Sequence, residues 1–287
     1  MTAATTDAYV IHYRKPPARA RVASAARILG IILVTLTFVF PLLWMLSAAF
    51  KSSLQIIDPS YTFQFAPTLA NFETVFRAQS FGQYILNSFI VGVGSTAIAL
   101  LLGVPAAYGI ARYKIKQATT FVLMARVIPG ISLLVPWYFL FSQLKMVGSY
   151  GVLILTHIFV TMPLVIAIMS GFFEGLPEEL EESAMIDGCN RLTAFLKITL
   201  PLSVPGIATS TILAFIFSWN NFLFALVLSN RGSRTLPVAI ANFTSYAAVD
   251  WGGLMAAAVV ITVPVMIIAL FAQRYVVAGL TSGATKG

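Results

Sequence analysis

Long apolar runs separated by short polar segments dominate this chain. Six runs reach the roughly 20 apolar residues that a membrane-spanning helix needs. They are Ile28–Phe50, Tyr84–Ile110, Thr119–Phe141, Tyr150–Phe173, Pro205–Leu228 and Gly253–Val276. Each run is predicted to be a helix, because a backbone in lipid must satisfy its hydrogen bonds within its own segment. The pattern therefore predicts an all-α, polytopic membrane protein with six transmembrane helices.

The composition agrees with this prediction. The chain is 59% hydrophobic and only 10% charged, with a mean hydropathy of +0.88, whereas a soluble domain carries about 25% charged residues. The net charge of +8 comes from Lys and Arg in the short segments between apolar runs, which favours a role in membrane orientation over nucleic-acid binding. Cys189, the single cysteine, excludes an internal disulfide. The run from Ile28 to Phe50 is longer than the apolar region of a signal peptide, so we expect a retained first span.

The basic residues also predict the orientation. With both termini in the cytoplasm, the inner segments hold twelve Lys and Arg residues and the outer segments hold five, and this asymmetry favours that topology. We therefore expect a multi-pass protein of the cell membrane, in a bacterium. Its expected parts are a cytoplasmic N-terminal tail over residues 1–27, a transmembrane domain over residues 28–277, and a cytoplasmic C-terminal tail over residues 278–287.

A polar insert interrupts the apolar pattern between the fourth and fifth spans. The stretch Pro177–Pro201 holds five of the ten carboxylates of the chain. It predicts a helix from Pro177 that stops at Gly188, and a second helix from the N-cap Asn190 to just before Pro201. The first helix is expected to place Leu180, Ala184 and Met185 opposite Glu178, Glu181 and Glu182. The second is expected to place Leu192, Phe195, Leu196 and Thr199 on one side.

Two short amphipathic helices cannot bury their apolar faces by themselves. A membrane-surface helix is usually rich in Lys and Arg, whereas this segment has six carboxylates between Glu174 and Asp187, which anionic lipid would repel. The insert therefore predicts a protein partner on the cytoplasmic side.

The spacing of the insert resembles a known motif. Glu182-Ser183-Ala184, three residues, Gly188, nine residues and Ile198-Thr199-Leu200-Pro201 resemble the EAA loop of ABC importer permeases, which reads E-A-A-x3-G-x9-I-x-L-P. The one departure is Ser183 in place of the first alanine. The resemblance implies that this loop, about residues 174–204, forms a coupling helix that docks on a cytoplasmic ATPase subunit. The coupling residues it implies are Glu182, Ser183, Ala184, Asp187, Gly188, Ile198, Leu200 and Pro201.

Two further stretches resemble the binding-protein-dependent carbohydrate importers of the maltose type. They are "LPLSVPG" at residues 200–206 and the C-terminal "RYVVAGLTSGATKG" from Arg274, which resembles the G-type permease of those systems. The resemblance implies a second homologous permease, a dimer of ATPase subunits and an extracytoplasmic sugar-binding protein as partners. It implies a di- or oligosaccharide, such as maltose or trehalose, as cargo.

Several residues within the spans are candidates for the substrate pathway. Trp219, Asn220 and Asn221 bring an indole and two amides into an apolar run; the alternative is hydrogen bonding between helices. Trp137 and Tyr138 are weaker candidates, because aromatic residues also form interfacial belts. Arg126 is the only cation in the interior of a span, since Arg274 lies at the cytoplasmic end of the last run. A charge there indicates function by default, but a position near the cytoplasmic end would let it snorkel, and a single cation disfavours a strongly phosphate-directed site.

The sequence holds no candidate for catalysis. It has no G-x-x-x-x-G-K-[ST] nucleotide-binding loop, so ATP and Mg would be used by the partner ATPase subunits, and this chain is expected to bind no cofactor and no metal. His12 lies in the N-terminal tail and His157 lies inside the fourth span, so the two histidines are not expected to form a metal site. The alternative hypothesis is an ion-coupled secondary transporter, which would need carboxylates or histidines within its spans. A structural scaffold would leave the gapped motif unexplained.

Overall fold

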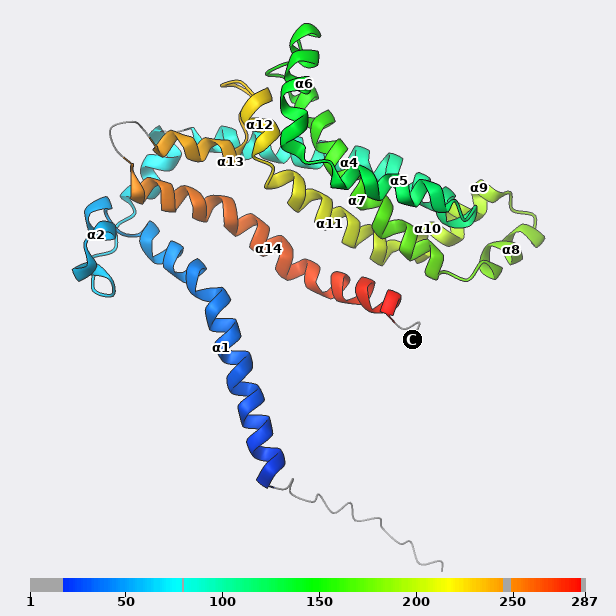
Figure 1. The fold of residues 1–287 in the computed structure, drawn as a ribbon, viewed down its shortest axis with the longest axis horizontal. Helices are drawn as coiled ribbons and strands as arrows, with labels where there is room; N and C mark the ends of the chain where they lie inside the picture. The colour runs from blue at the N-terminus through cyan, green and yellow to red at the C-terminus, as the bar shows by residue number, and fades with distance from the viewer. Residues whose placement is uncertain (1–17, 79, 245–248, 285–287) are drawn as a thin grey trace, which may run out of the picture. The chain divides into compact units, whose positions relative to one another are not determined.

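The computed structural model describes residues 18–78, 80–244 and 249–284, and helices make up most of these ranges (Figure 1). The chain forms two compact units, residues 1–47 and residues 48–287. Nearly all of helix α1 (Ala18–Ala49) belongs to the first unit, and its stretch Ser24–Ala49 is long and apolar enough to cross a membrane. The helix begins ahead of the predicted span, inside the expected tail of residues 1–27. Residues 1–17 lie outside the described residues.

Three more helices are continuous candidate spans. They are α4 (Phe81–Arg112), α7 (Tyr150–Gly175) and α14 (Trp251–Ala284). Helix α14 runs as far as Ala284, so it extends into the C-terminal tail that was expected from residue 278. Two further pairs of helices, Thr120–Val127 with Gly130–Gln143 and Arg191–Leu202 with Val204–Trp219, are each bent at a short break. Counting each pair as one span, the described residues provide between four and six candidate membrane crossings, and the predicted all-helical membrane fold is confirmed.

The third predicted span is broken in the middle. Helix α5 (Lys116–Val127) is followed by α6 (Gly130–Gln143), and the two are bent by 86°. The physical cause is Pro129, because a proline disfavours helical dihedrals in the residue before it. Ile128 is accordingly extended, with φ −64° and ψ 118°.

The fifth predicted span is also interrupted. Helix α11 (Val204–Trp219) ends at Asn220, and a short helix α12 (Leu223–Leu228) follows. Irregular backbone at membrane depth is tolerated where it lies inside protein or lines a cavity. Both interruptions therefore indicate segments that are buried in protein or line a cavity, and that do not face lipid.

Helices α4, α7 and α11 pack together as the centre of the second unit. Small residues allow the close approach: a Cβ added at Gly103 of α4 would lie 3.0 Å from Val165 Cγ1 of α7. Polar side chains also join the three helices, since Ser218 Oγ lies 2.7 Å from His157 Nδ1 and 2.9 Å from Ser95 Oγ. Close backbones and buried hydrogen bonds are the usual means of holding helices together in lipid.

Short helices cover the end of this unit away from the polar insert. They are α2 (Ser53–Ile57), η1 (Pro59–Tyr61), α3 (Ala70–Glu73), η2 (Thr74–Ala78), α13 (Leu236–Ala239) and η4 (Ile240–Phe243). The Asn87 amide of α4 ties the segment before α13 to the bundle by donating to the carbonyls of Gly232 and Arg234, at 2.9 and 2.8 Å.

Candidate functional site

The polar insert forms a compact helical loop between α7 and α11. Its elements are α8 (Glu179–Ile186), α9 (Arg191–Ala194), the π-helical turn η3 (Phe195–Thr199) and α10 (Leu200–Leu202). We call residues 176–203 the insert loop. Because it connects α7 directly to α11, any displacement of the loop acts on both helices.

The turn of the insert loop follows the sequence prediction. Gly188 has φ +94°, a left-handed conformation that glycine adopts without steric cost. Asn190 then caps the next helix, with its side-chain oxygen accepting from Thr193 N at 2.8 Å. The predicted stop and start are therefore confirmed.

The end of the second helix differs from the prediction. We expected it to stop just before Pro201, but helical structure continues through α10 to Leu202 and breaks at Ser203. The π-helical turn immediately before Pro201 widens the helix. A proline in an ordinary helix clashes with the carbonyl four residues earlier, and the wider turn provides the space that Pro201 needs.

A buried carboxylate anchors the insert loop to the bundle. Glu181 of α8 is 6% exposed. Its Oε1 accepts from Arg112 Nε at 2.9 Å and Nη2 at 2.7 Å, and also from the Thr199 hydroxyl. Its Oε2 accepts from the Tyr108 hydroxyl at 2.7 Å. One carboxylate thus joins α4, α8 and η3.

Arg112 extends the same network to α7. Its Nη1 lies 3.4 Å from the carbonyl oxygens of Phe173 and Leu176, at the end of that helix, where carbonyls lack helical partners. Burial is the strongest single influence on the pKa of Glu181 and raises it. The hydrogen bonds from Arg112, Thr199 and Tyr108, with the charge of Arg112, outweigh burial and hold the pKa below its usual value. Glu181 is therefore an ionised anchor at neutral pH.

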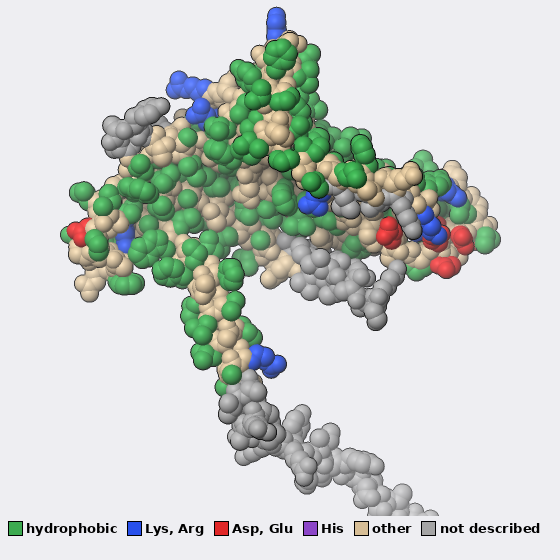
Figure 2. All heavy atoms as spheres, in the orientation of Figure 1, with side chains coloured by type: hydrophobic (Ala, Val, Ile, Leu, Met, Phe, Trp, Pro, Cys, Tyr) green, Lys and Arg blue, Asp and Glu red, His purple; other side chains and the backbone are tan. Residues whose placement is uncertain are grey.

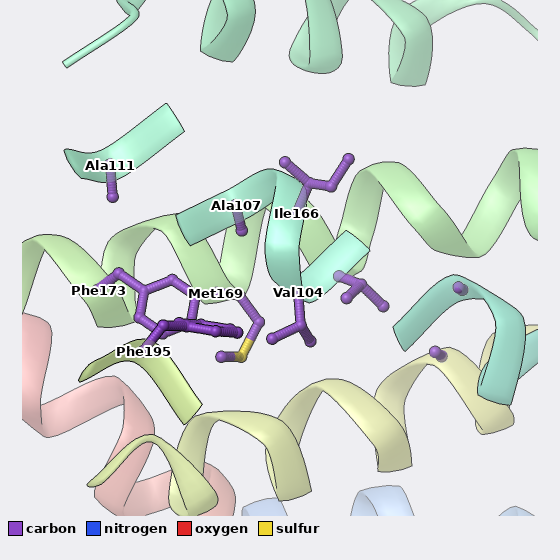
Figure 3. Close-up of a cluster of buried hydrophobic side chains, with 10 residues drawn as sticks. Val104, Ala107, Ala111, Ile166, Met169, Phe173 and Phe195 are labelled. Atoms are coloured by element: carbon purple, nitrogen blue, oxygen red, sulfur yellow. The ribbon is translucent and has the colours of Figure 1, made fainter. Parts of the chain in front are cut away.

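Apolar packing supports the anchor (Figure 3). Phe195 of η3 inserts among Ala107 and Val104 of α4 and Met169 and Phe173 of α7. The ring of Tyr108 lies 4.4 Å from that of Phe195, centroid to centroid. The loop is thus fixed on the two helices by both a buried ion pair and a buried aromatic residue.

The buried and exposed faces of the loop differ from the expected ones. Glu181 was expected on the polar face and is buried, because Arg112 offers it a charged partner. Phe195 and Thr199 are buried as well, whereas the apolar side chains of four other residues remain exposed: Leu180 at 44%, Ile186 at 86%, Leu192 at 67% and Leu196 at 51%. The loop therefore presents isolated apolar side chains beside its carboxylates.

The acidic side chains of the loop lie on this exposed surface. Glu178, Glu179, Glu182 and Asp187 are all exposed, and in Figure 2 a group of acidic side chains marks the end of the unit formed by α8. A surface of carboxylates and separate apolar side chains is suited to a protein partner with a basic, partly apolar cleft.

The residues of the gapped motif divide between the two faces of the loop. Ser183 and Gly188 are exposed with Glu182 and Asp187, and Pro201 is exposed near the start of α11. Ala184 is buried, and Ile198 and Leu200 are half-buried against the bundle. The exposed set is available to a partner, and the other three hold the loop in place.

A cavity of about 670 Å³ lies where the two broken spans meet. Its lining residues are Ala125, Arg126, Ile128, Gly130, Phe159, Val160, Pro163, Leu164, Ile216, Phe217, Asn220, Asn221, Phe222, Leu223 and Phe224. The volume is within the usual range for small-ligand pockets, and the composition is typical of them: mostly apolar and aromatic, with a few polar groups.

The cavity lies near the middle of the bundle. Its α7 residues begin at Phe159 and end at Leu164. At 1.5 Å per residue these are about 14 Å and 16 Å from the ends of that helix, Tyr150 and Gly175. The walls of the cavity include α7 and α11, which are the two helices that the insert loop connects.

Arg126 is the one charged residue among the described residues of the lining. It lies in the last turn of α5, about 15 Å along the helix from Lys116, so its depth argues against simple snorkelling at a helix start. An arginine at the centre of a span costs about 2.5–3.5 kcal/mol on insertion scales. The favourable interaction of its charge with the helix dipole at the α5 C-terminus offsets only about 0.3–1 kcal/mol of this cost. The position is therefore expensive, which favours a functional role.

Of the other predicted pathway residues, Asn220 and Asn221 line the cavity and three residues do not. Trp219 is 3% exposed, and its Nε1 donates to the Ile261 carbonyl of α14 at 3.2 Å, so it joins two helices. Trp137 supports the wall from behind, with ring centroids 5.0 Å from those of Phe159 and Phe224. Tyr138 is 47% exposed and lies outside the lining.

Sequence reasoning missed three residues of the anchor: Arg112, Tyr108 and Glu181. The signal for them was weak, because Arg112 was counted only as one of the basic residues that set orientation. Nor could the helix pattern show which of four neighbouring glutamates would be buried. Within the ranges that the structure describes, no group of three or more His, Cys, Asp or Glu residues could hold a metal ion.

Comparison with known proteins identifies the family. Residues 99–282 match the family described as the binding-protein-dependent transport system inner membrane component. The chain is 38% identical over 253 residues to the sulfoquinovosyl glycerol transport system permease protein SmoH of Agrobacterium fabrum, covering 86% of this chain and 89% of that protein. It is 37% identical over 257 residues to the trehalose transport system permease protein SugB of Mycobacterium tuberculosis, covering 86% and 92%.

A solved structure has the same fold. It is a bacterial ABC transporter involved in the import of the acidic polysaccharide alginate, and one of its chains aligns with a TM-score of 0.75 at 18% identity. The alignment covers 91% of this chain and 99% of that one. From its sequence match, its helical fold and its relatives, the chain belongs to the binding-protein-dependent transport system inner membrane components, the membrane-spanning permeases of ABC importers.

Proposed function

We propose that this chain is one of two permease subunits of an ATP-driven importer that carries a di- or oligosaccharide across the cell membrane. The observation that carries the proposal is the insert loop, a rigid element fixed to α4 and α7 by Glu181 that presents an exposed acidic and apolar surface. The named relatives support a carbohydrate cargo, but trehalose and sulfoquinovosyl glycerol differ enough to leave the sugar open.

The proposed partners follow from the two ends of the transport path. An ATPase dimer binds the insert loop in the cytoplasm and uses ATP and Mg there. A second homologous permease completes the path across the membrane, and an extracytoplasmic binding protein delivers the sugar. Both termini of this chain lie in the cytoplasm in this arrangement, as the distribution of basic residues predicts.

The mechanism uses the connection between the insert loop and the cavity. Closure of the ATPase dimer on ATP moves α8. Glu181 transmits that movement to α4 through Arg112, and the ends of the loop transmit it to α7 and α11. Because α7 and α11 form walls of the cavity, their tilt switches the path from inward-open to outward-open. Glu182 and Ser183 contact the ATPase in this mechanism, and Gly188 keeps the turn in shape.

The cavity is the proposed substrate path within this subunit. Asn220 and Asn221 offer the planar amide groups that bind sugar hydroxyls, and Phe159, Phe217 and Phe222 offer the aromatic surface on which sugar rings stack. Proline and backbone breaks at the same place allow the walls to move.

Uptake measurements test this function. Cells with and without the chain are given labelled maltose, trehalose, a longer oligosaccharide and an acidic disaccharide, each with ATP depleted or with the proton gradient collapsed. We expect loss of one sugar uptake on deletion, and dependence on ATP alone. Uptake that follows the proton gradient instead would support the ion-coupled alternative and contradict the proposal.

A variant of the exposed surface tests the partner. Ile186→Glu adds a charge to a side chain that is 86% exposed, so folding should be unchanged while the ATPase subunit is lost during purification of the complex. Leu54→Glu on α2, at a side chain that is 80% exposed outside the loop and outside the candidate spans, is the control and should retain the ATPase. Retention of the ATPase by Ile186→Glu would contradict the proposed docking surface.

A further inference from the structure

Arg126 carries a charge in the cavity that the described part of the chain does not neutralise. Among the described residues it forms no ion pair and no hydrogen bond. The described part of the cavity lining contains no Asp or Glu. The carboxylates of the described residues belong to the insert loop, the end of α7 or the loops at the opposite end of the bundle. Arg126 is exposed and lines the cavity, so its charge is available to a partner from outside these residues.

The polar groups beside Arg126 are also mainly donors. The side-chain oxygen of Asn221 accepts from Phe224 N at 3.3 Å. Because a backbone N–H can only donate, this contact fixes the amide so that the NH2 group is left for another partner. The Asn220 side chain makes no hydrogen bond among the described residues. A guanidinium and an amide NH2 group around one cavity are suited to a ligand rich in acceptor oxygens.

We propose that the transported sugar bears a single anionic group, a carboxylate or a sulfonate, and that Arg126 binds this group. The inference rests on the proposed function and narrows it to acidic glycosides, in place of neutral maltose or trehalose. One guanidinium matches one singly charged group, because its N–H groups pair with two acceptor oxygens at once. A phosphate monoester, with nearly two charges, would call for further cations, whereas Arg126 is the only cation among the described lining residues.

The depth of Arg126 favours the substrate over a lipid headgroup. It lies about 15 Å from the start of α5, half of a hydrocarbon core that is about 30 Å thick, where headgroups do not reach. A carboxylate of the second permease is the other conceivable partner. In that case Arg126 would be necessary for assembly of the two permeases and for the uptake of every substrate equally. An experiment that compares acidic and neutral substrates therefore distinguishes this partner from a substrate anion.

Two matched pairs of labelled sugars test the inference in the complete transporter, reconstituted in vesicles with its ATPase and binding protein. The pairs are glucosyl-glucose with glucuronosyl-glucose, and glucosyl glycerol with its 6-sulfonate, so that the members of each pair differ only in the acidic group. The variants are Arg126→Gln, Arg126→Lys and the control Arg231→Gln, which removes a charge from an exposed loop residue outside the cavity.

We expect the wild type to take up at least one acidic member more efficiently than its neutral counterpart. Arg126→Gln should lower that acidic uptake at least tenfold and change neutral uptake less than twofold. Arg126→Lys should retain an intermediate rate, because it keeps the charge without the planar fork, and Arg231→Gln should match the wild type.

The failures of the two proposals can be told apart. ATP-driven uptake that prefers neutral sugars, or that Arg126→Gln leaves unchanged, would overturn the acidic substrate and leave the importer function standing. Equal loss of every uptake, with weaker association of the two permeases, would assign Arg126 to the subunit interface and would also overturn it. Absence of ATP-driven uptake of any of the four sugars by the wild type would contradict the proposed function itself.

Discussion

The insert loop and the cavity are built in opposite ways. The loop is one contiguous segment of 28 residues, 176–203, whose turn, cap and anchor are formed by residues close together in sequence, with two partners from α4. The cavity is assembled from segments of α5, α6, α7, α11 and α12 and from the breaks between them. The loop stays rigid through a buried ion pair, whereas the cavity lies at two breaks where the backbone can bend. We infer that one region transmits force and the other accommodates cargo.

The largest expected effect comes from breaking the loop anchor. Arg112→Ala leaves Glu181 buried without its charged partner, and removing one partner of a buried pair costs about 3–5 kcal/mol. We expect the loop to detach from α4 and ATP-dependent uptake to fall below a tenth of the wild-type rate at equal protein level in the membrane. Protease sensitivity of the loop and uptake in the same vesicles measure the two effects.

A neighbouring ion pair provides the control. Lys114 Nζ lies 3.2 Å from Glu178 Oε1, and the two side chains are 74% and 48% exposed. Exposed pairs contribute only about 0–1 kcal/mol, so Lys114→Ala should retain nearly full uptake. If Lys114→Ala and Arg112→Ala lost similar amounts of uptake, uptake would depend on positive charge near the loop in general and not on the buried contact between Arg112 and Glu181.

The next effect concerns the turn of the loop. At φ +94° a side chain is strained; αL-type conformations cost ordinary residues roughly 1–2 kcal/mol, and a β-branched residue is a clear outlier there. Gly188→Val should therefore uncouple ATP hydrolysis from uptake while the protein still reaches the membrane. Gly175→Ala is the control, because a Cβ added at that helical glycine meets no atom within 4 Å. Undiminished uptake by Gly188→Val would count against the turn's role.

A smaller effect is expected in the cavity. Asn220→Ala removes one hydrogen-bonding group from the lining, and a net hydrogen bond contributes about 0.5–1.5 kcal/mol. Uptake efficiency should therefore fall between about twofold and tenfold, with coupling unchanged. Gln143→Ala removes an exposed amide at the end of α6, outside the lining, and should have no effect. If both variants behave alike, Asn220 has no contact with the cargo.

The smallest effect in the physiological range is that of pH on the anchor. Since the pKa of Glu181 is lowered in the folded protein, its contribution to stability is present above the unfolded pKa and is lost as pH falls through the folded pKa. The loop should therefore stay anchored from about pH 5 to 8 and detach only in stronger acid. An environment-sensitive dye on Cys189, the single cysteine, can report this. Detachment near pH 6 to 7 would contradict the assignment of Glu181 as an ionised anchor.

The same contrast explains what the sequence could predict. The turn at Gly188 and the cap at Asn190 depend on local backbone chemistry, so both were predicted correctly. The burial of Glu181 depends on Arg112, 69 residues away, and periodicity alone placed it on the polar face. The break in the third span can be read from the sequence, because Pro129 stands there. Only the folded chain shows that Ile128 and Asn220, which lie at the breaks of two different spans, line the same cavity.

The central claim is that the two regions have separable roles, and one paired measurement tests it most directly. ATP hydrolysis and sugar uptake are followed together in vesicles that contain the complete transporter with Gly188→Val or Arg126→Gln. We predict that the loop variant raises the ATP hydrolysed per sugar for every substrate without changing substrate preference. The cavity variant should change preference and leave that ratio as in the wild type. Altered preference in the loop variant, or an altered ratio for all sugars in the cavity variant, would contradict the division of roles.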